Sequence, residues 1–392
     1  MKRIFLFPTI IFILLLAYAF NDVMSSRQAG FRDASREEVY SYLQAIILLL
    51  AGYSIFKLKK EIVGTFLSTI MWLIMLWGGL VNIVLMYDQW IATVHFSLTV
   101  WWLATYYFFY SYVSRNPAAE KYLKILFTIM FCFYLWANIF ARRNILETFN
   151  IEYAVTGYAY HLVIFVPFFF LIKPVWFRAI LVTVTTLIVF SSYKRGPIVI
   201  LPLMLLIHQL TATFANKRWL SFTVKTILIV SFIIGIFTYV DEKSERFLSS
   251  RFSTEELEFG SGRDILREQS MGIIAARSFF DLLVGTGSGS SIHFLGTGVH
   301  NEWLEFLFNF GIIGVLLFGL FCIGVLRRYV ALLREGSHYA SSYGMMMVFL
   351  FAVSIFSGFY FTHWSFYFFA FMGFVEALIS LEQNKQESVN KI

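Results

Sequence analysis

Apolar stretches long enough to cross a membrane recur along the whole chain, and they leave few folds open to it. A transmembrane helix needs about 20 consecutive, mostly apolar residues. Of the 392 residues, 59% are hydrophobic and 14% are charged, whereas a soluble domain has roughly half apolar and a quarter charged residues. The sequence therefore predicts an all-α, polytopic integral membrane protein. We place its twelve spans near residues 4–20, 40–56, 62–87, 90–113, 125–140, 154–172, 178–192, 197–214, 219–240, 302–326, 341–361 and 364–381.

The cationic residues indicate the orientation of these spans, because cytoplasmic loops of membrane proteins carry an excess of lysine and arginine. With a cytoplasmic N-terminus every inside segment is basic, from Lys2 and Arg3 to the tail at 385–391. Both termini are therefore predicted to be cytoplasmic, and Glu376 is expected to reach the cytoplasmic edge of the last span. The net charge of +7 reflects these loops rather than nucleic-acid binding. The alternative for the first span is a cleaved signal peptide, since residues 17–19 (AYA) imitate a cleavage site.

One long segment between the ninth and tenth spans is predicted to lie outside the membrane, on the side opposite to the termini. It covers about 241–301, and structureless loops beyond roughly 15 residues are usually functional or disordered. The chain thus divides into nine spans within 1–240, this external loop, and three spans with a cytoplasmic tail within 302–392.

The second half of the external loop is predicted to form an amphipathic helix over 263–284. At helical spacing one of its faces is polar and the other apolar. The polar face carries Arg263, Arg267, Ser270, Arg277 and Asp281. Such a helix is suited to lie on the bilayer with its cations at headgroup depth. Its arginines either contact lipid phosphates in general or bind a specific phosphorylated lipid.

A glycine-rich link, GTGSGSS at 285–291, follows the amphipathic helix. Successive backbone N–H groups in such a turn can form an anion-binding nest. The link lacks the lysine and the spacing of a nucleotide-binding P-loop. It therefore gives a weak indication of an anion site and none of a nucleotide site.

Two basic pairs stand on the external side, against the positive-inside rule. Arg142 and Arg143 follow the fifth span, and Lys194 and Arg195 fill the hairpin between the seventh and eighth spans. Cations on the wrong side oppose the topology signal, so we expect them to serve another purpose. An external anion held at the membrane surface would bind them.

The external loop ends in a His300-Asn301 pair, directly before a span that carries Gly311 and Gly314. An imidazole where water meets a membrane helix is placed for chemistry, because histidine changes its charge near neutral pH. We expect the two glycines to let helices approach closely. The sequence shows no metal-binding or nucleotide-binding motif, so neither a metal nor a cofactor is predicted.

These motifs resemble those of the O-antigen polymerase and O-antigen ligase superfamily. His300-Asn301, followed after nine residues by GIIG at 311–314, is similar to its HN-x9-G-x2-G signature. The SGR at 261–263 resembles a motif of the polymerase branch, and Arg195-Gly196 resembles the RG motif of the family. The similarity covers roughly residues 150–320 and keeps the order of the motifs.

The resemblance implies a GT-C-like membrane glycosyltransferase in the bacterial inner membrane, with its large loop and its active site on the periplasmic side. Donor and acceptor would be oligosaccharides linked to undecaprenyl diphosphate, held among membrane lipids, and a polysaccharide chain-length regulator is an expected partner. In this interpretation His300 is the base, and Arg195 and Arg263 hold the pyrophosphate. Further substrate contacts are expected from Arg267, Arg277, Asn301, Lys194, Arg142 and Arg143.

Three functions remain open at this point. The SGR motif and the glycine-rich link favour a polymerase, which moves a growing glycan onto the next lipid-linked repeat unit. A ligase, which joins the glycan to lipid A core, would share the histidine and the arginines. A transporter is the alternative from another class, although transporters tend to show internal repeats, and no repeat is visible in this sequence.

Overall fold

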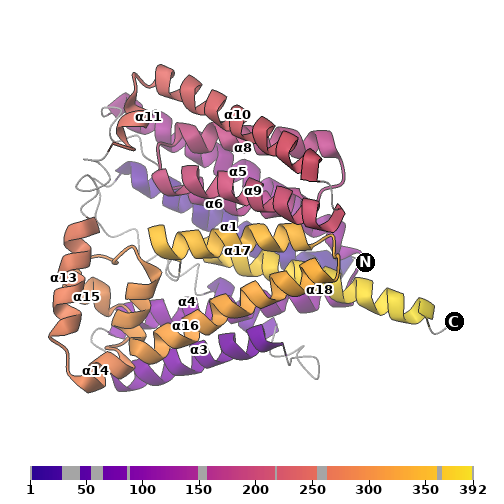
Figure 1. Ribbon diagram of the computed structural model, residues 1–392. Helices are drawn as coiled ribbons and strands as arrows, with labels where there is room; N and C mark the ends of the chain where they lie inside the picture. Colours follow the sequence, from indigo (N-terminus) through magenta and orange to yellow (C-terminus); the bar gives the residue numbers. More distant parts are fainter. Residues whose placement is uncertain are drawn as a thin grey trace.

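Every secondary-structure element in the described part of the computed structural model is a helix (Figure 1). The structure describes residues 2–28, 45–53, 65–85, 89–148, 157–216, 219–253, 263–359 and 364–390. The longer helices are α1 (Lys2–Gln28), α3 (Phe66–Val84), α4 (Gln89–Arg115), α5 (Ala119–Thr148), α8 (Val175–Ser191), α9 (Arg195–Asn216), α10 (Trp219–Lys243), α16 (Glu302–Arg334), α17 (Ala340–Phe356) and α18 (Trp364–Asn390). The shorter ones are α6 (Ala159–Ile164), α7 (Val166–Phe169), α11 (Phe247–Ser250), α13 (Arg263–Ala275), α14 (Phe279–Val284) and α15 (Ser290–Leu295).

Six helices among the described residues are long and apolar enough to cross a membrane. They belong to α3, α5, α9, α10, α16 and α18, and shorter apolar helices are found in α1, α6–α7, α8 and α17. Helices suit a bilayer because their backbone N–H and C=O groups bind one another, where no water can replace them. The chain is therefore a helical membrane protein, as its apolar runs predict.

Aromatic rings fill the centre of the bundle, where α4 packs along α18. Trp102 of α4 is 1% exposed and stacks on Phe369 of α18, with the ring centroids 4.8 Å apart. Phe321 of α16 packs on the same indole ring at 6.0 Å. In a membrane such close packing, rather than exclusion of water, holds helices together. On the other side of the core α17 contacts both α9 and α16, so these two helices share a neighbour.

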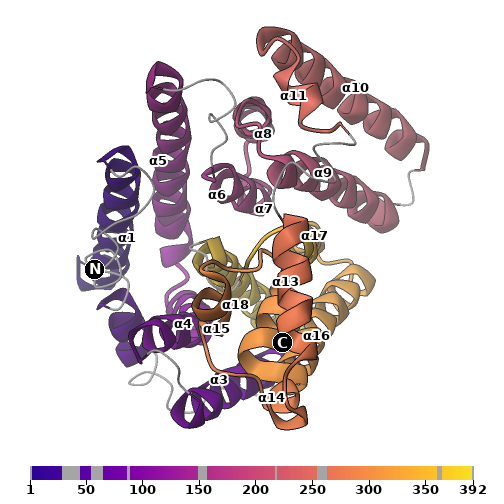
Figure 2. The same ribbon diagram turned by 90° about the vertical axis from the view of Figure 1, so that its left-hand side faces the viewer.

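The start of α1 and the end of α18 lie at one end of the bundle, and the short helices between α10 and α16 lie at the other (Figure 1). In that view α1 begins and α18 ends on the right, whereas α11, α13, α14 and α15 lie on the left. We call the left-hand end the loop end. Seen from this side in Figure 2, α13 crosses in front of the long helices. Both α9 and α16 begin at the loop end, so Arg195 and the residues before Glu302 lie on the same side of the molecule.

The span predicted at 154–172 is divided in the structure. Helix α6 ends at Ile164 and α7 begins at Val166, with a turn at Phe165 between them. Pro167 explains the break, because it lacks the N–H that would continue the helix and its ring crowds the carbonyl four residues earlier.

The amphipathic helix predicted over 263–284 is divided as well, which corrects the expected polar face. Ser278 starts a new helix, α14, because its hydroxyl accepts the N–H of Asp281 at 3.1 Å. A serine cap of this kind satisfies one of the unpaired N–H groups at a helix start. Arg277 therefore lies in the turn between α13 and α14 and does not continue the face of Arg267.

Glu376 is held by a neighbouring helix rather than by the membrane edge. Its side chain is 9% exposed, and its two oxygens accept hydrogen bonds from Nε and Nη2 of Arg328 at 2.8 and 2.7 Å. A buried carboxylate requires such a partner, since an unpaired buried charge is strongly destabilising. The pair joins α16 to α18 at the end of the bundle opposite to the loop end.

Candidate functional site

The turn between α8 and α9 places Lys194 and Arg195 at the loop end. Pro197 lies in the first turn of α9, where a helix does not need its N–H, so the helix can start directly at Arg195. The preceding Tyr193 is 1% exposed and has a φ of +53°, which is uncommon for a residue other than glycine. Both cations are half-buried. Nη1 of Arg195 donates to the carbonyl of Arg251 at 3.4 Å, which ties the turn to α11.

Arg142, near the end of α5, joins this turn through Tyr193. Its Nη2 binds the Tyr193 hydroxyl at 2.8 Å, and its guanidinium carbon lies 5.0 Å from the centre of the ring. Nε of Arg142 is buried and has no hydrogen-bond partner among the described residues. A buried donor is costly to leave without an acceptor. The adjacent Arg143 is exposed, and we call Arg142, Lys194 and Arg195 the cationic cluster.

Gly196 allows an aromatic ring to pack directly on the first turn of α9. A Cβ at this position would collide with the hydroxyl of Tyr160 in α6. Tyr160 in turn stacks on Trp364, the first residue of α18, with the ring centroids 4.8 Å apart. The glycine of the RG pair is thus required by packing.

His300 is exposed and lies in the connection that leads into α16. Its φ of +57° is in the left-handed region; such a conformation costs on the order of 1–3 kcal/mol and persists only where the surroundings impose it. Asn301 caps the helix, because its Oδ1 accepts the N–H of Leu304 at 3.1 Å. Its Nδ2 donates to the carbonyl of Ile355 at 3.4 Å. The backbone next to the imidazole is therefore fixed to α16.

Gly311 breaks α16 and allows the external loop to approach it. Its φ of +65° and ψ of −166° are adopted readily by glycine alone. A Cβ on Gly311 would collide with the carbonyl of Leu283, and one on Gly314 would collide with Phe310 in the same helix. The two glycines thus have structural roles, and Gly311 admits the C-terminal end of α14 and the start of the glycine-rich link.

The residues before this break receive hydrogen bonds from the glycine-rich link. The N–H groups of Thr286 and Gly287 donate to the carbonyls of Phe308 and Asn309 at 3.2 and 3.0 Å. Arg277 donates through Nη1 to the carbonyl of Phe308 at 3.0 Å and lies over its ring at 4.3 Å. The predicted anion nest is therefore wrong for these N–H groups, which bind α16. The guanidinium of Arg277 stabilises the same contact between the glycine-rich link and α16.

Two glutamates in the first turns of α16 are buried, which was not predicted from the sequence. Glu302 is 0% exposed and Glu305 is 2% exposed. Glu302 accepts the N–H of Phe359 at 2.5 Å, and Glu305 accepts the N–H of Val299 at 2.5 Å and the hydroxyl of Ser291 at 2.6 Å. Acidic residues are common in a first helical turn because the helix dipole favours them. Nothing in the sequence therefore marks these two as buried.

The other predicted arginines lie on α13, which crosses the loop end (Figure 2). Arg263 is its first residue, and the side chain of Arg263 lies outside the described residues. Arg267 is exposed. Ser270, expected on the same polar face, is 0% exposed, whereas Ile265 and Met271 are exposed. The helix thus presents cationic and apolar side chains together, as helices at a bilayer surface do.

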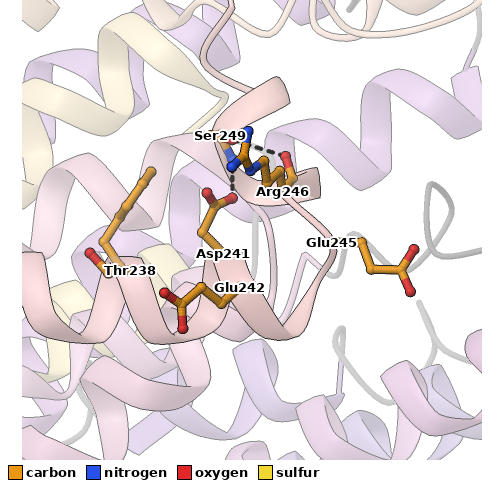
Figure 3. Close-up of a pocket in the computed structure, with 7 residues that line it drawn as sticks. Thr238, Asp241, Glu242, Glu245, Arg246 and Ser249 are labelled. Atoms are coloured by element: carbon orange, nitrogen blue, oxygen red, sulfur yellow. Dashed lines mark hydrogen bonds between the residues drawn. The ribbon is translucent and has the colours of Figure 1, made fainter.

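A hollow at the end of α10 is lined by acidic side chains (Figure 3). It includes the carboxylates of Asp241, Glu242 and Glu245 beside the single cation Arg246, and Asp241 accepts the N–H of Ser249 at 2.7 Å. Like charges repel, so the excess of carboxylates disfavours a diphosphate. In the part of the chain that the structure describes, no group of three or more histidine, cysteine or carboxylate side chains is placed to hold a metal ion.

These features define a helical membrane protein in which the cationic cluster and His300 lie at the loop end and form the candidate site. Comparison of the chain with models of known protein families and with curated proteins finds no match. Its activity has to be inferred from the residues at the loop end.

Proposed function

We propose that the protein is a glycosyltransferase of the O-antigen polymerase type, which transfers a growing glycan from undecaprenyl diphosphate to the next lipid-linked repeat unit. Support comes from the RG, SGR and HN-x9-G-x2-G motifs in their order along the chain. The observation that carries it is an exposed His300 on a strained backbone, at the same end of the bundle as Arg142 and Arg195. A base and phosphate-binding groups must meet on one side of the membrane to act on two lipid-linked substrates.

In the proposed step an acceptor hydroxyl attacks the anomeric carbon of the donor glycan. A glycosidic bond forms, and the bond from that carbon to the diphosphate breaks. His300, as a neutral imidazole, takes the proton of the hydroxyl. Undecaprenyl diphosphate leaves with its negative charge bound to Arg195 and Arg263, because a guanidinium binds phosphate oxygens in bidentate fashion. In this way arginines take the role that a divalent metal fills in other transferases.

The remaining candidate residues have different parts in this proposal. Nε of Arg142 and the ammonium group of Lys194 bind further diphosphate oxygens beside Arg195. Arg143 and Arg267, which are exposed, contact headgroups around the site. Asn301 and Arg277 stabilise the site indirectly, because their side chains form hydrogen bonds with α16 and with the segments around it.

The proposed protein crosses the bacterial inner membrane twelve times in a GT-C-like arrangement, with both termini cytoplasmic and the loop end periplasmic. Helices lie in each of the twelve predicted ranges. The two chain ends share one end of the bundle, which is consistent with an even number of crossings (Figure 1). A polysaccharide chain-length regulator is the expected protein partner.

Two other functions are separated from polymerisation by the phenotype of a strain that lacks the gene. Loss of a polymerase leaves lipopolysaccharide or capsule with single repeat units. A ligase would use the same His300 and Arg195, and its loss leaves unmodified lipid A core with glycan on the carrier. A transporter would account for the discontinuous helix α6–α7, and its loss traps glycan on the cytoplasmic side.

Arg195→Lys tests the phosphate-binding role directly. Lysine keeps the charge and loses the bidentate geometry. A hydrogen bond to a charged group contributes roughly 1.5–3 kcal/mol, so we expect the purified protein to bind undecaprenyl diphosphate about tenfold more weakly. Arg246→Lys, at the acidic hollow, is the control and should bind like the wild type. If Arg195→Lys bound undecaprenyl diphosphate as tightly as the wild type, Arg195 would not be part of the binding site.

A further inference from the structure

The buried carboxylate of Glu305 accepts three hydrogen bonds. Its carboxylate accepts hydrogen bonds from the N–H of Val299 at 2.5 Å, the hydroxyl of Ser291 at 2.6 Å and Nδ2 of Asn309 at 3.4 Å. The side chain is almost fully buried at the start of an otherwise apolar helix. Burying a carboxylate is unfavourable unless it is well hydrogen-bonded, so the three donors together explain how it is tolerated.

Both chain neighbours of His300 are held by hydrogen bonds. Oε1 of Glu305 accepts the N–H of Val299, and the carbonyl of Asn301 accepts the first backbone hydrogen bond of α16, from the N–H of residue 305 at 3.0 Å. His300 lies between these two fixed points with its φ at +57°. A left-handed histidine relaxes when its surroundings no longer impose the conformation. Glu305 is therefore placed to impose it.

We propose that Glu305 is a positioning residue, which acts through His300 by holding the backbone that presents the exposed imidazole at the loop end. This inference rests on the proposed function of His300 as the base. A base must lie within hydrogen-bond reach of the hydroxyl it deprotonates. A shift of about 1 Å in such a group can lower a rate by roughly 100-fold.

The substitutions at Glu305 separate positioning from simple loss of folding. Glu305→Ala removes the acceptor for Val299. Glu305→Gln keeps the volume and one oxygen, and it should restore most of the function. Ser291→Ala is the matched control, because it removes one donor to the same carboxylate and leaves the contact with Val299 intact.

The first measurement reports on the conformation of His300 without any assay of activity. Full-length protein in detergent is treated with diethyl pyrocarbonate, and modification of each histidine is followed by peptide mass spectrometry. In Glu305→Ala we expect the rate at His300 to change by about threefold or more as the residue leaves its imposed conformation. The rate at the exposed, distant His338 should not change, and Ser291→Ala should match the wild type at both. An unchanged rate at His300 in Glu305→Ala would overturn the inference.

The second measurement is a double-mutant cycle on turnover, with the lipid-linked repeat unit extracted from the deletion strain as substrate. We expect Glu305→Ala to lower kcat by about 100-fold with little change in KM, and Glu305→Gln to recover most of it. In a His300→Ala background the same substitution should cause no further loss, because residues that act as one unit are not additive. A further loss there would mean that Glu305 acts independently of His300.

The two measurements distinguish a failure of the inference from a failure of the proposed function. Full activity of His300→Ala would refute the role of the histidine, whereas the modification rates would still show whether Glu305 controls its conformation. An inactive His300→Ala with unchanged modification in Glu305→Ala would refute only the positioning role. If Glu305→Ala does not fold, Glu305→Met gives the same comparison, because methionine fills a similar volume and offers no oxygen to the N–H of Val299.

Discussion

Gly311→Ala should detach the glycine-rich link from α16. At the φ and ψ of this position an alanine costs on the order of 1–3 kcal/mol in backbone strain, and its Cβ would collide with the carbonyl of Leu283. If the loop moves away, the bonds from Thr286 and Gly287 to α16 are lost, at about 1 kcal/mol each. The expected loss of stability in this region is thus about 3–5 kcal/mol.

Gly319→Ala provides the matched control in the same helix. A Cβ there meets only the ring of Trp303 at 3.7 Å, an ordinary van der Waals contact. We expect thermal unfolding of the full-length protein in detergent, followed by size-exclusion chromatography, to show a midpoint several degrees lower for the Gly311 variant alone. Limited proteolysis within 277–290 should be faster in the same variant. Equal midpoints and equal cleavage for both variants would refute the docking of the link at Gly311.

Two further predictions concern Tyr193 and the Arg328–Glu376 pair. Tyr193→Phe removes the hydroxyl that binds Arg142 and keeps the ring. Undecaprenyl diphosphate should therefore bind about threefold to tenfold more weakly, and the melting temperature should fall by a few degrees, as expected for the loss of one hydrogen bond. Unchanged affinity would show that this turn does not take part in lipid binding. Arg328→Met leaves Glu376 buried without its partner and should lower the free energy of unfolding by about 3–5 kcal/mol, whereas Arg328→Met combined with Glu376→Leu should recover most of it. Thermal unfolding of the single and double variants measures this difference, and a single variant as stable as the wild type would contradict the importance of the pair.

The sequence predicts the helical membrane fold well because length and apolarity are local properties of each segment. It is less successful where distant residues decide the backbone. The helix predicted over 263–284 breaks at Ser278, which caps α14, and Arg277 beside this break binds the carbonyl of Phe308 in α16. Thr286 of the glycine-rich link binds the same carbonyl. These contacts join residues 31 and 22 positions apart in the chain, and no local sequence pattern predicts them.

The candidate site was predicted in part, through cations that oppose the positive-inside rule. Topology alone marks Arg142 and Arg195 as unusual, and the structure brings Arg142 to the turn that precedes Arg195. Tyr193, which joins Arg142 to this turn, carries no such mark, because a tyrosine between two membrane spans is ordinary. The burial of Glu305 is equally hidden, since two of its three donors, Ser291 and Val299, lie in the segment before α16.

The most direct test of the proposed function is the surface polysaccharide made by a strain that lacks the gene and carries His300→Ala. We predict single repeat units only, at an expression level equal to that of the wild-type protein. His338→Ala, exposed at the opposite end of the bundle, should restore the full ladder of chain lengths. Full-length polymer from the His300 variant would contradict a catalytic role for this residue.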